Sequence, residues 1–318
     1  MLGGVGVEQS VAMGAFLLRR LTTLIPVLAG VLTAVFLLIH MIPGDPVEVM
    51  LGEMAMPSDR EALRHELHLD EPLLMQFGRY VRGISQGNLG VSLHSGRPVR
   101  EVLAERMLPT LLLTLSAMGV ALSIAFPLGL LSAIRAGTVV DHGAMIAALL
   151  GVSMPHFWLG PLLLLVFSVN LGWLPLGGME GIDSFVLPAI TLGSAMAAIL
   201  TRMIRASLLE VMDREFVRAA LAKGLSRWQV LVRHVLSNAL IPVITVIGLQ
   251  FGALLAGAII TETIFSWPGL GRLTVEAIQT RDYPVVQGCV MVICLGYVCA
   301  SLIADICYAA ADPRVRLR

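Results

Sequence analysis

The sequence predicts an all-α membrane protein with six transmembrane helices. Of its 318 residues, 57% are hydrophobic and 14% are charged, whereas a soluble domain carries about 25% charged residues. Uncharged apolar runs recur along the chain, and each is long enough to cross the hydrocarbon core, which takes roughly 18 to 20 helical residues. The runs do not alternate apolar and polar residues, so a transmembrane β-barrel is not expected. The net charge is zero, so the charge balance does not favour nucleic acid as a partner.

Six apolar runs are the expected spans. They cover residues 21–42 (the first transmembrane helix), 108–134, part of 143–179, 184–201, 236–261 and 283–304. Pro155 in the third run predicts a kink, and the adjacent His156 is expected to be a hydrogen-bonded packing residue. Residues 1–20 are expected to form a cytoplasmic N-terminal segment, in which Met13 is an alternative start and no secretory processing site is evident.

Basic residues in the short loops orient the spans with both termini in the cytoplasm, because such residues concentrate on the cytoplasmic side. That side would hold the basic run that follows the fourth span, together with Arg19, Arg20, Arg135, Arg314, Arg316 and Arg318. The short loops on the other side carry only Arg272 and Arg281. The long segment 43–107 then lies outside, in the periplasm.

Residues 43–107 are expected to fold into helices along the outer membrane surface, and a plain solvated loop is the alternative. Ser58 and Glu61 have the spacing of a capping box. A helical apolar stripe follows, made of Leu73, Leu74, Phe77, Tyr80, Val81 and Ile84. Pro98 is expected to open an amphipathic helix, whose polar face would carry Arg100, Glu101, Glu105 and Arg106.

One stretch between apolar runs, Asp213 to Pro242, combines dense positive charge with signals for two short helices. Its cationic side chains are Arg214, Arg218, Lys223, Arg227, Arg233 and His234. Residues 219–222 are strong helix formers, and Gly224 can adopt the left-handed conformation that ends a helix. Ser226 and Gln229 form a second capping box. The pattern predicts two helices joined by a sharp glycine turn outside the lipid.

Two interpretations of this stretch are open. A basic cytoplasmic loop that only fixes topology would account for the charge. It would not account for the paired helix signals, or for Phe216 and Trp228 among so many charges. We therefore favour a short rigid helix pair that docks in a groove of a partner protein.

The stretch RAALAKGLSRWQVLVRHVLSNALIP (residues 218–242) resembles the EAA loop of importer-type ABC transporter permeases, with its alanine pair four residues before a glycine. Arg218 replaces the leading glutamate of that motif, so no salt bridge is expected from this position. Four further stretches resemble the dipeptide and oligopeptide branch of the same family. They are HMIPGDP (40–46), TETIFSWPGLGRL (261–273), RDYPVVQ (281–287) and DICYAAADPRVR (305–316). Together they make the resemblance extend over nearly the whole chain from about Met13.

The resemblance implies the type I ABC importer permease architecture, with residues 108–318 as the permease core and 207–236 as a cytoplasmic coupling loop. The residues expected to couple to an ATPase are Phe216, Arg218, Ala219, Ala220, Lys223, Gly224, Leu225 and Trp228. It implies a homologous second permease subunit, two ABC ATPase subunits and a solute-binding protein outside a bacterial inner membrane. No cofactor is expected in this chain, because ATP and Mg²⁺ would be bound by the ATPases. Dipeptides, oligopeptides or glutathione are the implied substrates, and nickel or a nickel chelate is the alternative.

The expected translocation pathway is marked by polar residues within apolar runs. Gln250 is the main candidate, because a polar amide at bilayer depth usually faces the bundle interior or a water-filled cavity. Thr245 and Ser153 are further candidates. Gly248 and Gly252 in the same run form a GxxxG pattern, which favours close packing against a neighbouring helix.

The outer loop between the last two runs is expected to contact the solute-binding protein or to gate the pathway. Trp267, Pro268 and Gly269 make it stiff and turn-rich, and Arg272 follows them. An aromatic residue anchored at the membrane interface is the alternative for Trp267.

Several functional classes are disfavoured. The chain has no G-x-x-x-x-G-K-[ST] loop and no H-E-x-x-H motif, so ATP hydrolysis would require separate subunits. An intramembrane hydrolase or an ion-driven carrier would need carboxylates at bilayer depth, whereas Glu262 and Asp305 are expected at the two interfaces. No metal site is expected, although His65 and His68 could share a helix face and bind nickel.

Overall fold

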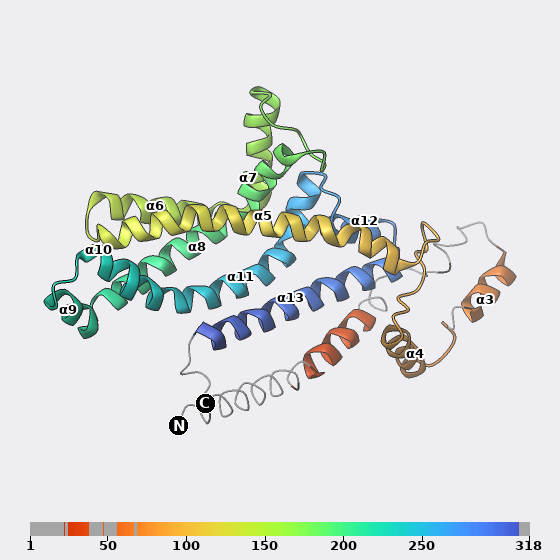
Figure 1. Ribbon diagram of the computed structural model, residues 1–318. Helices are drawn as coiled ribbons and strands as arrows, with labels where there is room; N and C mark the ends of the chain where they lie inside the picture. The colour runs from red at the N-terminus through yellow and green to blue at the C-terminus, as the bar shows by residue number, and fades with distance from the viewer. Residues whose placement is uncertain (1–21, 23–24, 38–46, 48–55, 67–68, 312–318) are drawn as a thin grey trace, which may run out of the picture.

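The computed structural model describes residues 22, 25–37, 47, 56–66 and 69–311. Within these residues all regular structure is helical, apart from one isolated antiparallel bridge between Val91 and Pro98. The predicted all-α class is therefore confirmed. Long helices lie side by side along the molecule (Figure 1), as expected where apolar helices must satisfy their own backbone in lipid.

Four segments are long and apolar enough to span a membrane, and they fall where four of the six spans were predicted. They are α5 (Val99–Ile134), α8 (Val186–Met212) with the short η2 helix (Ile182–Phe185) before it, α10 (Arg227–Val230) running through η3 (Leu231–Leu236) into α11 (Ser237–Ile264), and α13 (Tyr283–Ala311). The first expected span contains a shorter apolar helix, Ile25–Leu37. Residues 21, 23–24 and 38–42 of that expected span lie outside the described residues.

The third predicted span is a broken one. Its two parts are α6 (Val139–Ser153) and α7 (His156–Leu163), which continues into η1 (Leu164–Asn170), and they are bent by 100°. The predicted kink at Pro155 is confirmed. Helix α7 runs across the direction of α6 in Figure 1, and it contacts α8 and α11. His156 beside the bend shares a 2.8 Å hydrogen bond between its Nδ1 and the carbonyl oxygen of Thr191, as expected of a packing residue.

Two helices extend beyond the predicted limits. The amphipathic helix expected after Pro98 and the span expected from Leu108 form one 36-residue helix, α5, so the expected boundary at 107/108 falls within it. Helix α8 continues past Thr201 as far as Met212. The end of an apolar run indicates where the lipid ends. It does not indicate where the helix ends, because charged residues also form helix and can continue it beyond the bilayer.

The outer segment contains α3 (Pro57–Glu66) and α4 (Leu73–Ser85). The capping box expected at Ser58 was wrong. Helix α3 already begins at Pro57, because proline is well suited to the first helical position, and the Ser58 hydroxyl faces Asp59 at 3.5 Å. The apolar stripe of α4 is partly confirmed, since its later residues are half-buried whereas Leu73 and Leu74 are exposed.

The core lies between α5, α8 and α11, whose small residues allow close approach. A Cβ at Gly193 of α8 would lie 2.5 Å from the carbonyl oxygen of Ala117 on α5. On α11, a Cβ at Gly248 would lie 2.0 Å from the Ala304 Cβ, and one at Gly252 would meet the ring of Tyr297. The predicted GxxxG packing is therefore confirmed, with α13 of the same chain as the neighbour.

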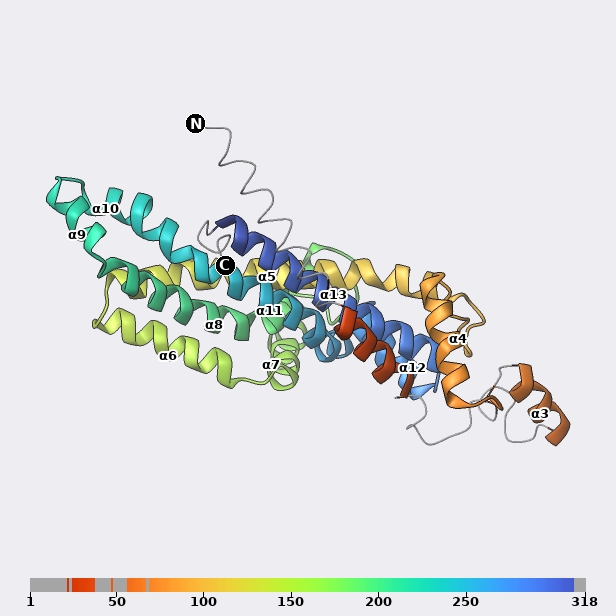
Figure 2. The ribbon, with the colours of Figure 1, turned by 90° about the horizontal axis from the view of Figure 1, so that it is seen from below.

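The helix pair (α9 and α10) and the outer segment lie at opposite ends of this bundle. Helix α9 covers Glu215–Ala222. Both views place α9 and α10 at one end and α3, α4 and α12 (Leu270–Gln279) at the other (Figures 1 and 2). The helix pair and the outer segment are therefore separated by the length of the long helices.

Candidate coupling site

The predicted helix, glycine turn and helix are present. After α9, Gly224 has φ +86° and its N–H donates to the Leu221 carbonyl at 3.0 Å. Glycine adopts such a backbone at no steric cost, because it has no Cβ. Ser226 then caps α10: its hydroxyl accepts from the Gln229 N–H at 3.3 Å, and its own N–H donates to the Gln229 side chain at 3.0 Å. The turn geometry is therefore fixed locally, by backbone and cap.

The helix pair presents an apolar surface that the described chain does not cover. Every residue from 221 to 229 is exposed. The large hydrophobic side chains at this surface are Phe216, Leu221, Leu225 and Trp228, the last of which is 66% exposed. Val217 and Val230 point the other way and are buried in the core. Exposed apolar residues gathered on a rigid turn are typical of a protein-binding surface.

Charged side chains near this apolar surface form ion pairs with one another. Arg218 donates to Asp213 at 2.6 Å, and Arg214 donates to Glu210 at 2.6 Å. No salt bridge was expected from Arg218, and the structure shows one with Asp213. Both pairs are more than half exposed, so they orient side chains and add little stability.

A buried ion pair supports the same end of the bundle. Asp141, at the start of α6, is 3% exposed, and its carboxylate accepts 2.6 and 2.7 Å hydrogen bonds from Arg205 of α8. The Ser132 hydroxyl of α5 and the Gly137 N–H also donate to it. Three helices are thereby joined. This pair was not predicted from the sequence, although an aspartate at the edge of an otherwise uncharged run was a usable signal.

The outer loop differs from the expectation at Trp267. Its indole is fully buried, donates from Nε1 to the Pro109 carbonyl at 3.0 Å, and packs edge-on against Phe185 with ring centroids 4.6 Å apart. It is therefore neither an interfacial anchor nor an exposed contact. Gly269 is also buried. Pro268 and Arg272 remain partly exposed.

Glu262 was expected at the outer interface and is instead fully buried. Its carboxylate accepts from the Thr110 hydroxyl at 2.6 Å and from the Arg272 N–H at 3.0 Å. Thr110 in turn accepts from the Leu270 N–H at 2.8 Å. The carboxylate thus caps the N-terminus of α12, where unpaired N–H groups favour negative charge, and ties α11, α12 and α5 together.

The predicted pathway residues do not form one cluster. Gln250 and Thr245 are half-buried on α11, and the buried Thr245 hydroxyl has no hydrogen-bond partner among the described residues. Ser153 is exposed at the end of α6, where its hydroxyl donates back to the Leu149 carbonyl. Helix α6 packs mainly on α8 and α5. Their role in a pathway remains a prediction.

Solved structures with the same fold are ABC transporters. The chain matches an inward-facing structure of the MetNI methionine ABC transporter with a TM-score of 0.54 and 17% identity, over 67% of this chain and 97% of that one. An amino acid ABC transporter crystallised with histidines matches with a TM-score of 0.51 and 17% identity, over 68% and 94% of the two chains. The fold is therefore that of a polytopic ABC transporter permease.

The chain belongs to the family of binding-protein-dependent transport system inner membrane components. That family's model matches residues 125–317, and the model of its N-terminal region matches residues 13–114. The glutathione transport system permease protein GsiC of Escherichia coli K12 is 43% identical over 95% of this chain and 99% of its own length. GsiC of Salmonella paratyphi A is also 43% identical over the same shares.

Proposed function

We propose that this chain is a permease subunit of an ATP-driven importer for dipeptides, oligopeptides or glutathione, and that it forms half of the translocation pathway. The observation that carries the proposal is the exposed apolar turn around Gly224, at the opposite end of the bundle from the outer segment. Such a surface suits a partner that pushes on one end of the helices while substrate enters at the other. No covalent chemistry is assigned to this chain.

The proposed partners follow from these two roles, since one partner would bind at each end of the bundle. Two ABC ATPase subunits, which hold ATP and Mg²⁺, would grip the α9–α10 turns of this chain and of a homologous second permease. A solute-binding protein would deliver substrate to the outer end, where Pro268 and Arg272 are the accessible residues of the expected contact. Nucleotide state and substrate state would then bias one conformational equilibrium.

The substrate class is supported by the GsiC relatives, whose name states glutathione transport. A nickel or nickel-chelate importer of the same family is the alternative. Binding of the cognate solute-binding protein to dipeptides, glutathione and nickel would separate them by calorimetry. Tight binding of nickel alone would exclude the peptide assignment.

The coupling proposal is tested by Gly224→Pro in the complete complex reconstituted in proteoliposomes. Proline requires φ near −65°, whereas Gly224 has φ +86°, so the turn cannot keep its shape. Substrate-stimulated ATP hydrolysis and uptake should fall at least tenfold, while the permease still inserts. Gly224→Asn is the matched control, since asparagine tolerates positive φ, and it should retain most of the uptake. Unchanged uptake in Gly224→Pro would overturn the assignment of the turn.

A further inference from the structure

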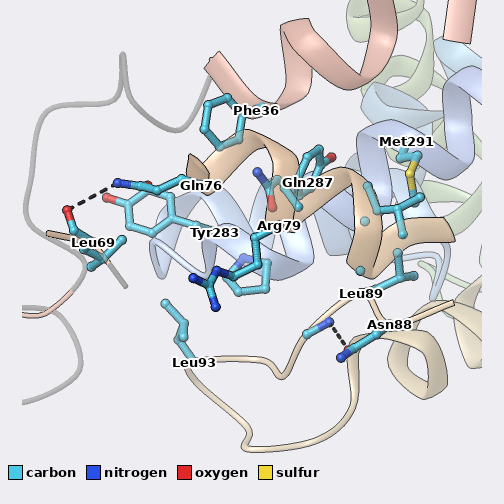
Figure 3. A pocket seen from close by; sticks show the side chains of 16 residues that line it. Phe36, Leu69, Gln76, Arg79, Asn88, Leu89, Leu93, Tyr283, Gln287 and Met291 are labelled. Carbon is cyan, nitrogen blue, oxygen red and sulfur yellow. Dashed lines mark hydrogen bonds between the residues drawn. The ribbon is translucent and has the colours of Figure 1, made fainter. Parts of the chain in front are cut away.

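A cavity of about 370 Å³ lies at the outer-segment end, between α4, the loop after it and the first turns of α13. Figure 3 shows Phe36 and Met291 on one side of it and the Arg79 guanidinium on the opposite side. The volume is within the range of small-molecule sites, roughly 300 to 1,000 Å³. The cavity is separate from the coupling turn and from the predicted pathway residues.

The walls of the cavity are polarised. Phe36 comes from the short apolar helix Ile25–Leu37, and Met291 comes from α13, which is long and apolar enough to span a membrane. Arg79 and Tyr80 come from α4 of the outer segment. The Phe36 ring contacts the Tyr80 ring with centroids 5.8 Å apart, which holds the apolar wall against the polar one. A ligand that fits must therefore have an apolar end and a polar end.

The polar wall contains two hydroxyl groups that have no hydrogen-bond partner among the described residues. They belong to Tyr80 and Tyr283, and both are buried. Burial raises the pKa of Tyr80 to about 12, so this phenol keeps its proton at neutral pH. Two unpaired buried hydroxyls are costly unless a ligand or water accepts from them.

The charge at the cavity favours an anion. Arg79 is its cation, and no carboxylate is among the residues that line it. Glu71 engages Arg79 only through Nη2, at 2.5 and 2.8 Å, which leaves Nε and Nη1 for a ligand. A peptide or glutathione would bring an ammonium group that these lining residues cannot pair. A phosphodiester brings only acceptor oxygens.

We propose that this cavity binds a single phospholipid, whose phosphate accepts hydrogen bonds from Arg79, Tyr80 and Tyr283 and whose upper acyl chain contacts Phe36 and Met291. The lipid would occupy the seam between the outer segment and the spans. Because α4 and α13 form opposite walls, the bound lipid would brace the outer segment on the span that begins at Tyr283. The site does not depend on the coupling role of the α9–α10 turn.

The test is native mass spectrometry of the purified complex after exchange into phosphatidylglycerol-containing micelles. The wild-type complex should retain one phosphatidylglycerol. The double variant Tyr80→Phe/Tyr283→Phe and the single variant Arg79→Gln should each bind this lipid at least tenfold more weakly. Arg82→Gln is the matched control, since Arg82 is exposed on the same helix and does not line the cavity. Diacylglycerol, which has no phosphate, should not be retained.

Thermal stability separates lipid loss from misfolding. The phenylalanine variant keeps both rings and removes two unpaired hydroxyls, so the delipidated variant should be at least as stable as the wild type. Added phosphatidylglycerol should raise the Tm of the wild type more than that of the variant. Equal lipid retention by all variants, or stoichiometric displacement of the lipid by glutathione, would overturn the proposal.

Discussion

Single buried carboxylates fix the outer end of this permease through hydrogen bonds to backbone N–H groups and hydroxyls. Glu262 caps α12 while Thr110 links that cap to α5. Asp282 acts in a similar way at the start of α13, where its carboxylate accepts from the Ser92 hydroxyl at 2.5 Å and from the Leu93 N–H at 3.1 Å. Loops that look irregular in the sequence are held by these carboxylates.

Glu262→Ala should destabilise the permease, because it leaves the Arg272 N–H without its acceptor and leaves the Thr110 hydroxyl only the Arg106 carbonyl at 3.4 Å. An unsatisfied buried group costs about 1–3 kcal/mol, so the detergent-solubilised Tm should fall clearly. Glu262→Gln retains one acceptor oxygen, so its Tm should fall less than that of Glu262→Ala. Glu276 pairs with Arg272 at the surface, so Glu276→Ala serves as the control with little change. Equal losses for the alanine variants at 262 and 276 would contradict the capping role.

The sequence predicts residues well when the signal is local. The Gly224 turn and the Ser226 cap depend on neighbours within four residues, and both were predicted. Trp267 and Glu262 were misplaced because their environment comes from α5, more than 150 positions away in the chain. An apolar or acidic residue beside a span end gives no indication of whether a distant helix will cover it.

At the scale of elements, the helices follow hydropathy in their centres and depart from it at their ends. Helices α5 and α8 run beyond the apolar stretches, because the helix continues wherever residues such as Arg205 find a partner. The break of the third span was predictable from Pro155, but its 100° angle was not. Packing of α6 on α8 and α5, which local sequence does not encode, sets that direction.

The contact between α11 and α13 gives an element-scale prediction. Gly248→Ala places a Cβ at 2.0 Å from that of Ala304, so the helices must separate. Overpacking of this kind costs about 1–3 kcal/mol, and both Tm and uptake should decrease. Gly119→Ala is the matched control, because a Cβ at this exposed position of α5 meets no atom within 4 Å. Equal decreases in Tm and uptake for Gly248→Ala and Gly119→Ala would contradict the tight contact between α11 and α13.

At the scale of the whole molecule, the structure shows the α9–α10 turn and the outer segment at opposite ends. Their orientation in the membrane is inferred from the charge pattern alone. The basic residues predict that the α9–α10 turn is cytoplasmic, and the outer segment would then lie outside. Hydropathy gave the class and most spans without any knowledge of contacts. It could not give the cavity at Tyr80 and Tyr283, whose walls are separated by some 200 residues in the chain.

Reporter fusions in a bacterial host would test this orientation. Alkaline phosphatase fused at the C-terminus should be inactive, and a fluorescent reporter fused there should be active, because that end is expected in the cytoplasm. Phosphatase fused after Gly96, within the outer segment, should be active and serves as the control. The reverse pattern would overturn the orientation.

The unbroken path from α10 through η3 into α11 has a mechanical consequence. This helical rod runs from Arg227 to Ile264, and the Ser207 hydroxyl of α8 is bonded to its Ala239 carbonyl at 2.6 Å. If that contact acts as a fulcrum, the arm toward Arg227 is roughly 18 Å long and the arm toward Ile264 is roughly 38 Å, at 1.5 Å per residue. A small displacement at the α9–α10 turn would then be about doubled where Glu262 meets α12, and a short push would become a wider movement at the outer end.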